Sequence, residues 1–211
     1  MAVSCPPVPA ALPLLKLESL SRNTVLFRVG LQPFPATAWD RRVTADYRFS
    51  ALIDDSGCAL PVTYCGYSAE VALLETVLRF GVEGAVVELS AVSGRFLAEV
   101  ETTRDLQLIP LVGPSARVLG EGVAIGVTQC PASDYVQTRQ WAHALRAVHP
   151  SADGIAWLSR QHGEHRALML WGDKDEPGAP LRVRAQVPLT DSRALAQIQR
   201  LAERVGMIVV D

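Results

Sequence analysis

The stretch that most constrains this fold is residues 62–80, VTYCGYSAEVALLETVLRF, where a strand pattern passes into a helix pattern. The β-branched and aromatic residues up to Tyr64 favour a strand. Ser68 is a preferred N-cap residue, so we expect a helix to begin there and to end before Gly81. This stretch therefore predicts a strand–turn–helix unit to which the rest of the chain is added.

The remainder of the chain alternates between strand and helix patterns without a regular βαβ period. Strands or short extended elements are predicted at 24–30, 84–92, 95–101, 105–111, 153–159, 165–171 and 207–211, and further helices at 136–148 and 190–206. The chain has no GxGxxG motif. We therefore predict an α+β fold, a single domain with mixed or antiparallel sheets and flanking helices, rather than a doubly wound parallel sheet.

Length, charge and cysteine usage narrow the class of protein. A chain of 211 residues suits one well-packed domain, and residues 1–20, rich in Pro and Ala, are predicted to form an extended arm outside the core. The net charge of −2 argues against direct binding of nucleic acid. No apolar run approaches the roughly 18 residues of a membrane span. Cys5, Cys58, Cys65 and Cys130 are scattered, which favours reduced thiols and a cytoplasmic location.

Glu75 is the first candidate for chemistry, because it lies on the predicted helix among apolar residues such as Leu74 and Leu78. Two interpretations are open. Glu75 faces the sheet and acts on a ligand, or it reaches solvent and pairs with Arg79 one turn later.

Arg28 is the second candidate, because it lies in the middle of a strand between Phe27 and Val29. A guanidinium group there needs an anion, either a phosphate or carboxylate of a ligand or a structural partner such as Asp46. Four further arginines belong to this basic set, namely Arg41, Arg42, Arg48 and Arg160. We interpret the first two of these as ordinary surface residues.

Two other patterns point only weakly to chemistry. The histidines of HGEH, residues 162–165, match neither helical zinc-binding spacing and fall in a predicted hairpin turn, so we expect no metal site. Cys65 or Cys130 could serve as a nucleophile beside a histidine, but a free cysteine is more often a small buried apolar residue.

Four segments in order, LFRVG, YRFSA, LPVTYCGYSAEVALLETVLR and QWAHALRAVHPSADGIAWLSRQHGEHRALMLW, resemble the RES domain family of bacterial toxins. Arg28, Tyr64, Glu75 and Ser159 match the arginine, tyrosine, glutamate and serine of the family pattern. The resemblance spans roughly residues 24–172, and residues 21–211 are identified as the RES-like catalytic domain.

The resemblance also shows departures. The GGRWN loop of the family is reduced here to DYRFS, in which Arg48 and Phe49 match its Arg-Trp pair. Trp157 and Leu158 stand where the family has Tyr-Pro.

The resemblance implies an ADP-ribosyltransferase-like fold and cleavage of NAD at the nicotinamide–ribose bond. It implies that Arg28, Tyr64, Glu75 and Ser159 are catalytic, and that Arg28, Arg48, Tyr64, Ser159 and Arg160 bind the substrate. NAD would be a substrate rather than a cofactor, with inorganic phosphate as a co-substrate if the reaction is phosphorolysis. No metal is required.

The resemblance further implies the toxin of a toxin–antitoxin pair. Its partner would be a cognate antitoxin with a helix-turn-helix DNA-binding domain, so that DNA binding belongs to the partner in a hetero-oligomeric complex. Two alternatives stay open: transfer of ADP-ribose to a macromolecule, and a catalytically silent nucleotide-binding module.

Overall fold

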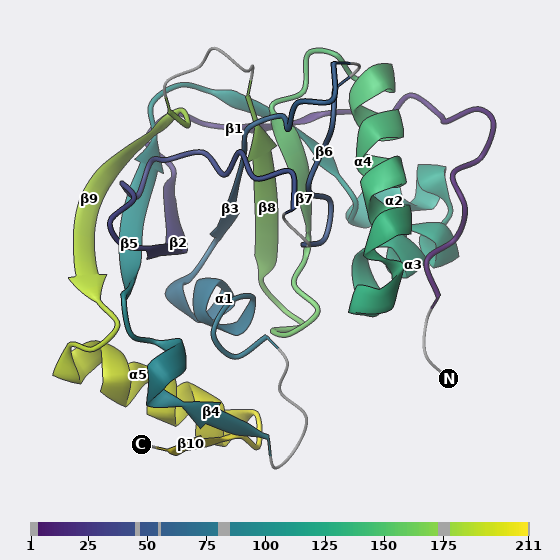
Figure 1. The fold of residues 1–211 in the computed structure, drawn as a ribbon. Helices are drawn as coiled ribbons and strands as arrows, with labels where there is room; N and C mark the ends of the chain where they lie inside the picture. The colour runs from purple at the N-terminus through teal and green to yellow at the C-terminus, as the bar shows by residue number, and fades with distance from the viewer. Residues whose placement is uncertain (1–3, 45–46, 55, 80–84, 173–177, 211) are drawn as a thin grey trace.

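A curled, mostly antiparallel sheet organises the chain (Figure 1). The computed structural model describes residues 4–44, 47–54, 56–79, 85–172 and 178–210. The sheet has the order β1-β6-β7-β8-β3-β2-β5-β9, and its one parallel pair is β6 with β7 in the part of the chain described. Its strands are β1 (Glu18–Leu20), β2 (Val25–Leu31), β3 (Val62–Gly66), β5 (Arg95–Thr102), β6 (Leu106–Pro110), β7 (Gly154–Leu158), β8 (Arg166–Trp171) and β9 (Leu181–Pro188).

The helices lie in two groups around this sheet. Figure 1 shows α2, α3 and α4 gathered beside β6 and β7, and α5 with a small parallel pair, β4 and β10, at the opposite end. The bounds are α1 (Ala69–Leu74), α2 (Gly113–Leu119), α3 (Glu121–Gln129), α4 (Tyr135–Val148), α5 (Ser192–Arg204), β4 (Val86–Glu88) and β10 (Ile208–Val210). The predicted α+β class with mixed sheets and flanking helices is confirmed.

Three apolar clusters hold these layers together. Trp141 and Leu145 of α4 are fully buried against Ile155 of β7 and its neighbours. A second cluster fills the other face of the sheet, and a third packs α1 against α5 through Leu73 and Ile198. Burying an aromatic or branched aliphatic side chain stabilises the fold by about 1.5–3 kcal/mol each, so these clusters supply most of the driving force.

The N-terminal arm is extended as predicted, but the expectation that it lies outside the core is wrong. Cys5 and Leu15 are buried in the same cluster as Trp141. The indole of Trp141 donates a hydrogen bond of 2.7 Å to the carbonyl of Pro6, and the backbone amide of Leu15 donates to the ring of His149. The proline-rich composition predicted the extended backbone but not the buried indole and apolar surface that this backbone covers.

The predicted helix after β3 is also shorter than expected. It begins at the predicted N-cap, where Ser68 accepts a hydrogen bond from the amide of Val71. The helix ends at Leu74, because the amide of Thr76 donates to the carbonyl of Leu73, three residues back. The hydroxyl of Thr76 donates to the carbonyl of Ala72. Such bonds convert a helix into tight turns. The predicted end at Gly81 lies outside the described residues.

Several other elements differ from the sequence-based expectations. The strand predicted at 84–92 is limited to β4, followed by a 3-10 turn at Leu89–Ala91. Helices α2 and α3 and strands β1 and β9 were not predicted. The remaining predicted strands and helices are present within one or two residues of their expected bounds.

Gly154 provides a test of the packing between β7 and β8. A Cβ at this position would lie 2.1 Å from the carbonyl oxygen of Met169, which belongs to the paired strand and cannot move aside. We expect Gly154→Ala to lower the free energy of unfolding by about 1–3 kcal/mol, the usual cost of overpacking, measured by denaturant titration. Gly122→Ala is the matched control, because a Cβ there meets nothing within 4 Å. Equal stability of the two variants would contradict this account.

Candidate functional site

A cavity of about 550 Å³ lies where β2 and β3 separate. In the described sheet these strands are paired at a single position, Phe27 opposite Gly66, so their remaining lengths diverge. The cavity is lined from both strands, from α1 and the turn after it, and from the loop between β2 and β3. This volume falls within the range of about 300–1,000 Å³ that is typical of small-molecule sites.

Glu75 lines this cavity from the C-cap of α1. The hydroxyl of Ser159 donates a hydrogen bond of 2.6 Å to its Oε1. Ser159 itself follows β7, is fully buried, and accepts a bond from the amide of His162. Because that amide occupies the serine oxygen as a donor, the serine proton is directed to the carboxylate. Ser159 is not among the residues that line the cavity, and it orients Glu75 from the buried side of that carboxylate.

The alternative interpretation of Glu75, an ion pair with Arg79, is not what the structure contains. Both side chains are described, and no ion pair joins them. Arg79 donates instead to the hydroxyl of Tyr135 at 2.5 Å and lies over the rings of Tyr47 and Tyr135. The carboxylate of Glu75 is half-buried at the cavity wall.

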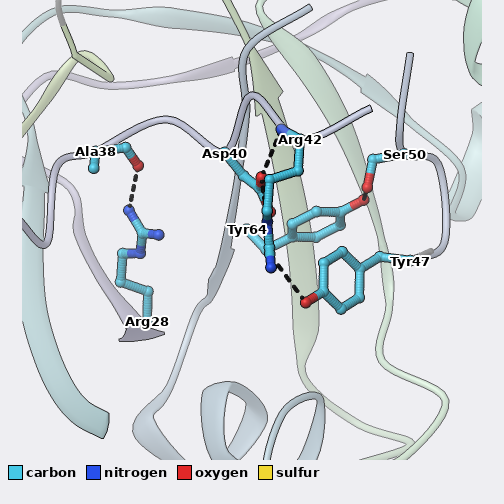
Figure 2. A network of polar contacts seen from close by, with 7 residues as sticks. All are labelled: Arg28, Ala38, Asp40, Arg42, Tyr47, Ser50 and Tyr64. Carbon is cyan, nitrogen blue, oxygen red and sulfur yellow. Dashed lines mark hydrogen bonds and ion pairs between the residues drawn. The ribbon is translucent and has the colours of Figure 1, made fainter. Parts of the chain in front are cut away.

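Tyr64 contributes its ring to the cavity, while its hydroxyl is engaged elsewhere (Figure 2). The hydroxyl donates to the carbonyl of Arg48 and lies 2.8 Å from the hydroxyl of Ser50. Burial raises the pKa of Tyr64, so the phenol stays neutral at physiological pH. The ring packs edge-on against Tyr47 and Trp157. Stacking on a ligand is the contact that this arrangement leaves available.

Arg28 enters the cavity from β2. Its Nη1 donates to the carbonyl of Ala36 at 2.6 Å and to that of Ala38 at 3.0 Å, the second of which Figure 2 shows. These bonds tie the loop to the strand. Its Nε is buried and has no hydrogen-bond partner within the described residues. Burial lowers the pKa of Arg28, but a guanidinium remains charged at neutral pH. The structural partner considered from sequence, Asp46, lies outside the described residues.

The other predicted arginines differ in their placement. Arg48 lines the cavity but is 7% exposed, and it donates to the carbonyls of Val127 and Cys130 and to the Cys130 thiol. Arg160 is exposed, donates to the same Cys130 carbonyl, and is not among the residues that line the cavity. Their assignment to substrate binding stays a prediction.

Arg41 and Arg42 are exposed, as predicted for surface residues, and both also line the cavity. Arg42 forms a bidentate ion pair with Asp40, at 2.9 and 2.6 Å, and donates to the hydroxyl of Tyr47. Asp40 and Tyr47 were not recognised from sequence. A signal was present, because two adjacent arginines follow an aspartate in a segment that also holds Trp39, an aromatic residue in a polar loop.

Comparison with known proteins supports the family suggested by sequence. A family model described as the RES domain matches residues 25–192. The chain belongs to the RES domain family. Among curated proteins none matches it. One similar solved structure is described as the crystal structure of the M. tuberculosis MbcT-MbcA toxin-antitoxin complex. The match has a TM-score of 0.54 and 18% sequence identity, and it covers 88% of this chain and 92% of that chain.

The remaining candidates of this RES domain chain are two histidines in a turn and two buried cysteines, of which only Cys65 lines the cavity. His162 and His165 stack at 4.4 Å in the turn between β7 and β8, where His162 contacts Glu70 and His165 contacts Ser68. The described residues contain no group of three or more side chains suited to a metal ion. Cys130 is a free, fully buried thiol, and Cys65 is free and lines the cavity beside Arg28, with its pKa raised by burial to about 11.

Ser159→Ala tests the support of Glu75. Removing a buried hydroxyl leaves the amide of His162 without an acceptor and the carboxylate without its donor, so we expect a loss of about 1–2 kcal/mol in the free energy of unfolding. Ser93→Ala, at an exposed position, is the control and should change stability by less than about 0.5 kcal/mol. A Ser159→Ala variant as stable as the control would show that this network is not formed.

Proposed function

We propose that this RES domain protein is the toxin of a toxin–antitoxin pair and cleaves NAD at the nicotinamide–ribose bond. The observation that supports this best is Glu75, a carboxylate at a cavity wall that is oriented by a serine hydroxyl. Around it lie Tyr64 and Arg28, the other two cavity residues that match the family pattern.

The proposed chemistry follows from the charge that develops during bond cleavage. Loss of nicotinamide leaves positive, oxocarbenium-like charge on the ribose, and a carboxylate close to that ring stabilises it as carboxylates do in glycoside cleavage. Glu75 supplies the carboxylate, and Ser159 fixes its rotamer. Because the cavity wall holds this geometry before the substrate arrives, little reorganisation is required in the transition state.

Binding is assigned to the other side chains of the cavity. Tyr64 presents a ring on which a nicotinamide or ribose can lie, and its hydroxyl is held by Ser50 and the carbonyl of Arg48. Arg28 lines the same cavity, and the positive charge of its guanidinium would attract a phosphate group of the ligand.

The direct experiment is to incubate the purified protein with NAD, with and without inorganic phosphate, and to follow free nicotinamide. We expect release of nicotinamide. Phosphate dependence would identify phosphorolysis, and label transferred from NAD to a macromolecule in lysate would identify an ADP-ribosyltransferase. A folded, inhibitor-free protein that releases no nicotinamide under either condition would overturn the proposal.

Glu75→Gln separates catalysis from binding. The amide keeps the shape of the side chain but lacks the charge, so we expect kcat to fall by about 10²–10³ while KM changes little. A melting curve should show the variant folded. An active Glu75→Gln enzyme would end the catalytic interpretation of this residue.

Arg28→Ala should have a different signature. The substitution removes a charged donor from the cavity and releases the carbonyls of Ala36 and Ala38, so we expect KM for NAD to rise by about tenfold or more. Steady-state kinetics measure this change, and Arg200→Ala on α5, remote from the cavity lining, is the control. An unchanged KM would show that Arg28 serves only to anchor the loop.

A toxin that consumes NAD in its own cell requires a partner that silences it. We propose a cognate antitoxin with a helix-turn-helix DNA-binding domain, acting in the cytoplasm. The similarity in fold to a chain from a toxin–antitoxin complex supports the partner. Within the described residues no helix is long and apolar enough to cross a membrane. Tight binding of operator DNA by the isolated protein at physiological salt would contradict this division of roles.

A further inference from the structure

Arginine and tyrosine side chains alternate along one wall of the cavity. Arg42 lies over the ring of Tyr47 with 5.9 Å between Cζ and the ring centroid, and Arg79 lies over the same ring at 5.5 Å. Arg79 and Arg48 each lie 5.1 Å from the centroid of Tyr135. We name these five residues, Arg42, Tyr47, Arg79, Tyr135 and Arg48, the arginine–tyrosine ladder. All except Tyr135 line the cavity.

The tyrosine rings of the ladder explain how three guanidinium groups can lie close together in one wall of the cavity. Like charges in proximity repel each other, and this repulsion is stronger near a protein surface than in water. The negative faces of tyrosine rings attract guanidinium groups, which offsets part of the repulsion. An array of this kind is costly to assemble for packing alone, whereas it suits a site that a polyanion occupies.

The charge balance of the cavity also indicates that its ligand is an anion. Its described lining includes six arginines and two carboxylates, Asp40 and Glu75, in a chain whose net charge is −2. Asp40 is paired with Arg42 and Glu75 with the hydroxyl of Ser159. The excess of positive charge is therefore concentrated on the cavity, where it attracts anions.

The members of the ladder differ in what they can offer a ligand. Arg48 is nearly buried, and its donors reach the carbonyls of Val127 and Cys130. The side chain of Arg42 is 61% exposed; its Nε and Nη2 are held by Asp40, so Nη1 is the nitrogen that it can offer a ligand. Arg79 is half-buried at the cavity. The positive charge of Arg79 acts on Tyr64, where it opposes the burial that raises the pKa of that phenol. Its charge is thus felt inside the cavity.

We propose that Arg79 and Arg42, positioned by the ring of Tyr47, form a seat for phosphoryl oxygens. This inference rests on the proposed function, since the seat would hold either the diphosphate of the dinucleotide or a free inorganic phosphate that attacks the ribose. Planar guanidinium groups match the geometry of phosphoryl oxygens, and charge-assisted hydrogen bonds are about twice as strong as neutral ones.

The test is equilibrium binding of ligands that do not react. Calorimetry with ADP, AMP, adenosine and inorganic phosphate is carried out on the wild-type chain and on Arg79→Gln and Arg42→Gln. Arg117→Gln is the matched control, because Arg117 is exposed on α2 and pairs with Glu121 away from this cavity. We expect ADP to bind more tightly than adenosine, and each ladder variant to raise the Kd for ADP or for phosphate by about tenfold, the effect of losing one charged hydrogen bond.

The titrations with ADP and with inorganic phosphate distinguish the two sources of the phosphoryl group. A raised Kd for ADP assigns the seat to the diphosphate, and a raised Kd for inorganic phosphate alone assigns it to a co-substrate. Wild-type protein that binds neither anion, or ladder variants that bind both as the Arg117→Gln control does, would overturn the proposal. If Arg79→Gln fails to fold in a melting curve, the more exposed Arg42 decides the result. Because ADP carries no nicotinamide, a failure to cleave NAD leaves this test intact.

Discussion

The close approach of α1 to the end of β3 is the constraint on which the site depends. A Cβ on Gly66 would lie 2.8 Å from the Cβ of Val71 and 2.9 Å from the amide nitrogen of Ala72, so only glycine allows the helix to sit this low on the strand. Gly66 is also the residue at which β3 pairs with β2, opposite Phe27. One position without a side chain thus joins the strands, seats the helix and sets the level at which Glu75 reaches the cavity.

The sequence was most informative where local physical signals are strong. The N-cap at Ser68, the run of β-branched and aromatic residues in β2 and β3, and the spacing of Trp141 and Leu145 in α4 each depend on neighbours in the chain, and each predicted its element. The family pattern predicted functional roles for Glu75 and Ser159, which are 84 positions apart in sequence, and the structure joins them by a hydrogen bond. That contact could not be derived from spacing in a single sequence.

The parts that sequence did not predict depend on tertiary contacts. Helices α2 and α3 contain Gly113, Pro114, Gly122 and Gly126, and Gly120 separates them, a composition that local propensity assigns to loops. Strand β9 is a different case, because its sequence LRVRAQVP does alternate apolar and polar residues, so a local strand signal was present and was not recognised. It pairs with β5 and is exposed along most of its length. The arginine–tyrosine ladder draws its members from the β2–β3 loop, the turn after α1 and the start of α4, so no linear motif records it.

The separation of charges within the cavity reconciles two demands of the proposed reaction. The ligand is anionic, which calls for arginines, yet its ribose becomes positive during cleavage, which calls for an uncompensated carboxylate. An ion pair between Glu75 and Arg79 would satisfy neither demand. Opposite charges about 4 Å apart attract each other by roughly 4 kcal/mol near a protein surface, and each would cancel the field of the other at the ligand.

Neutral side chains keep the two groups apart in this protein. Arg79 is engaged by the rings of Tyr47 and Tyr135, and Glu75 by the hydroxyl of Ser159. Each charge is therefore oriented by contacts with neutral groups. Under the proposed function, phosphoryl groups on the ladder would then balance its arginines. The carboxylate would remain the dominant charge at the ribose in the substrate-bound state, when its field is needed.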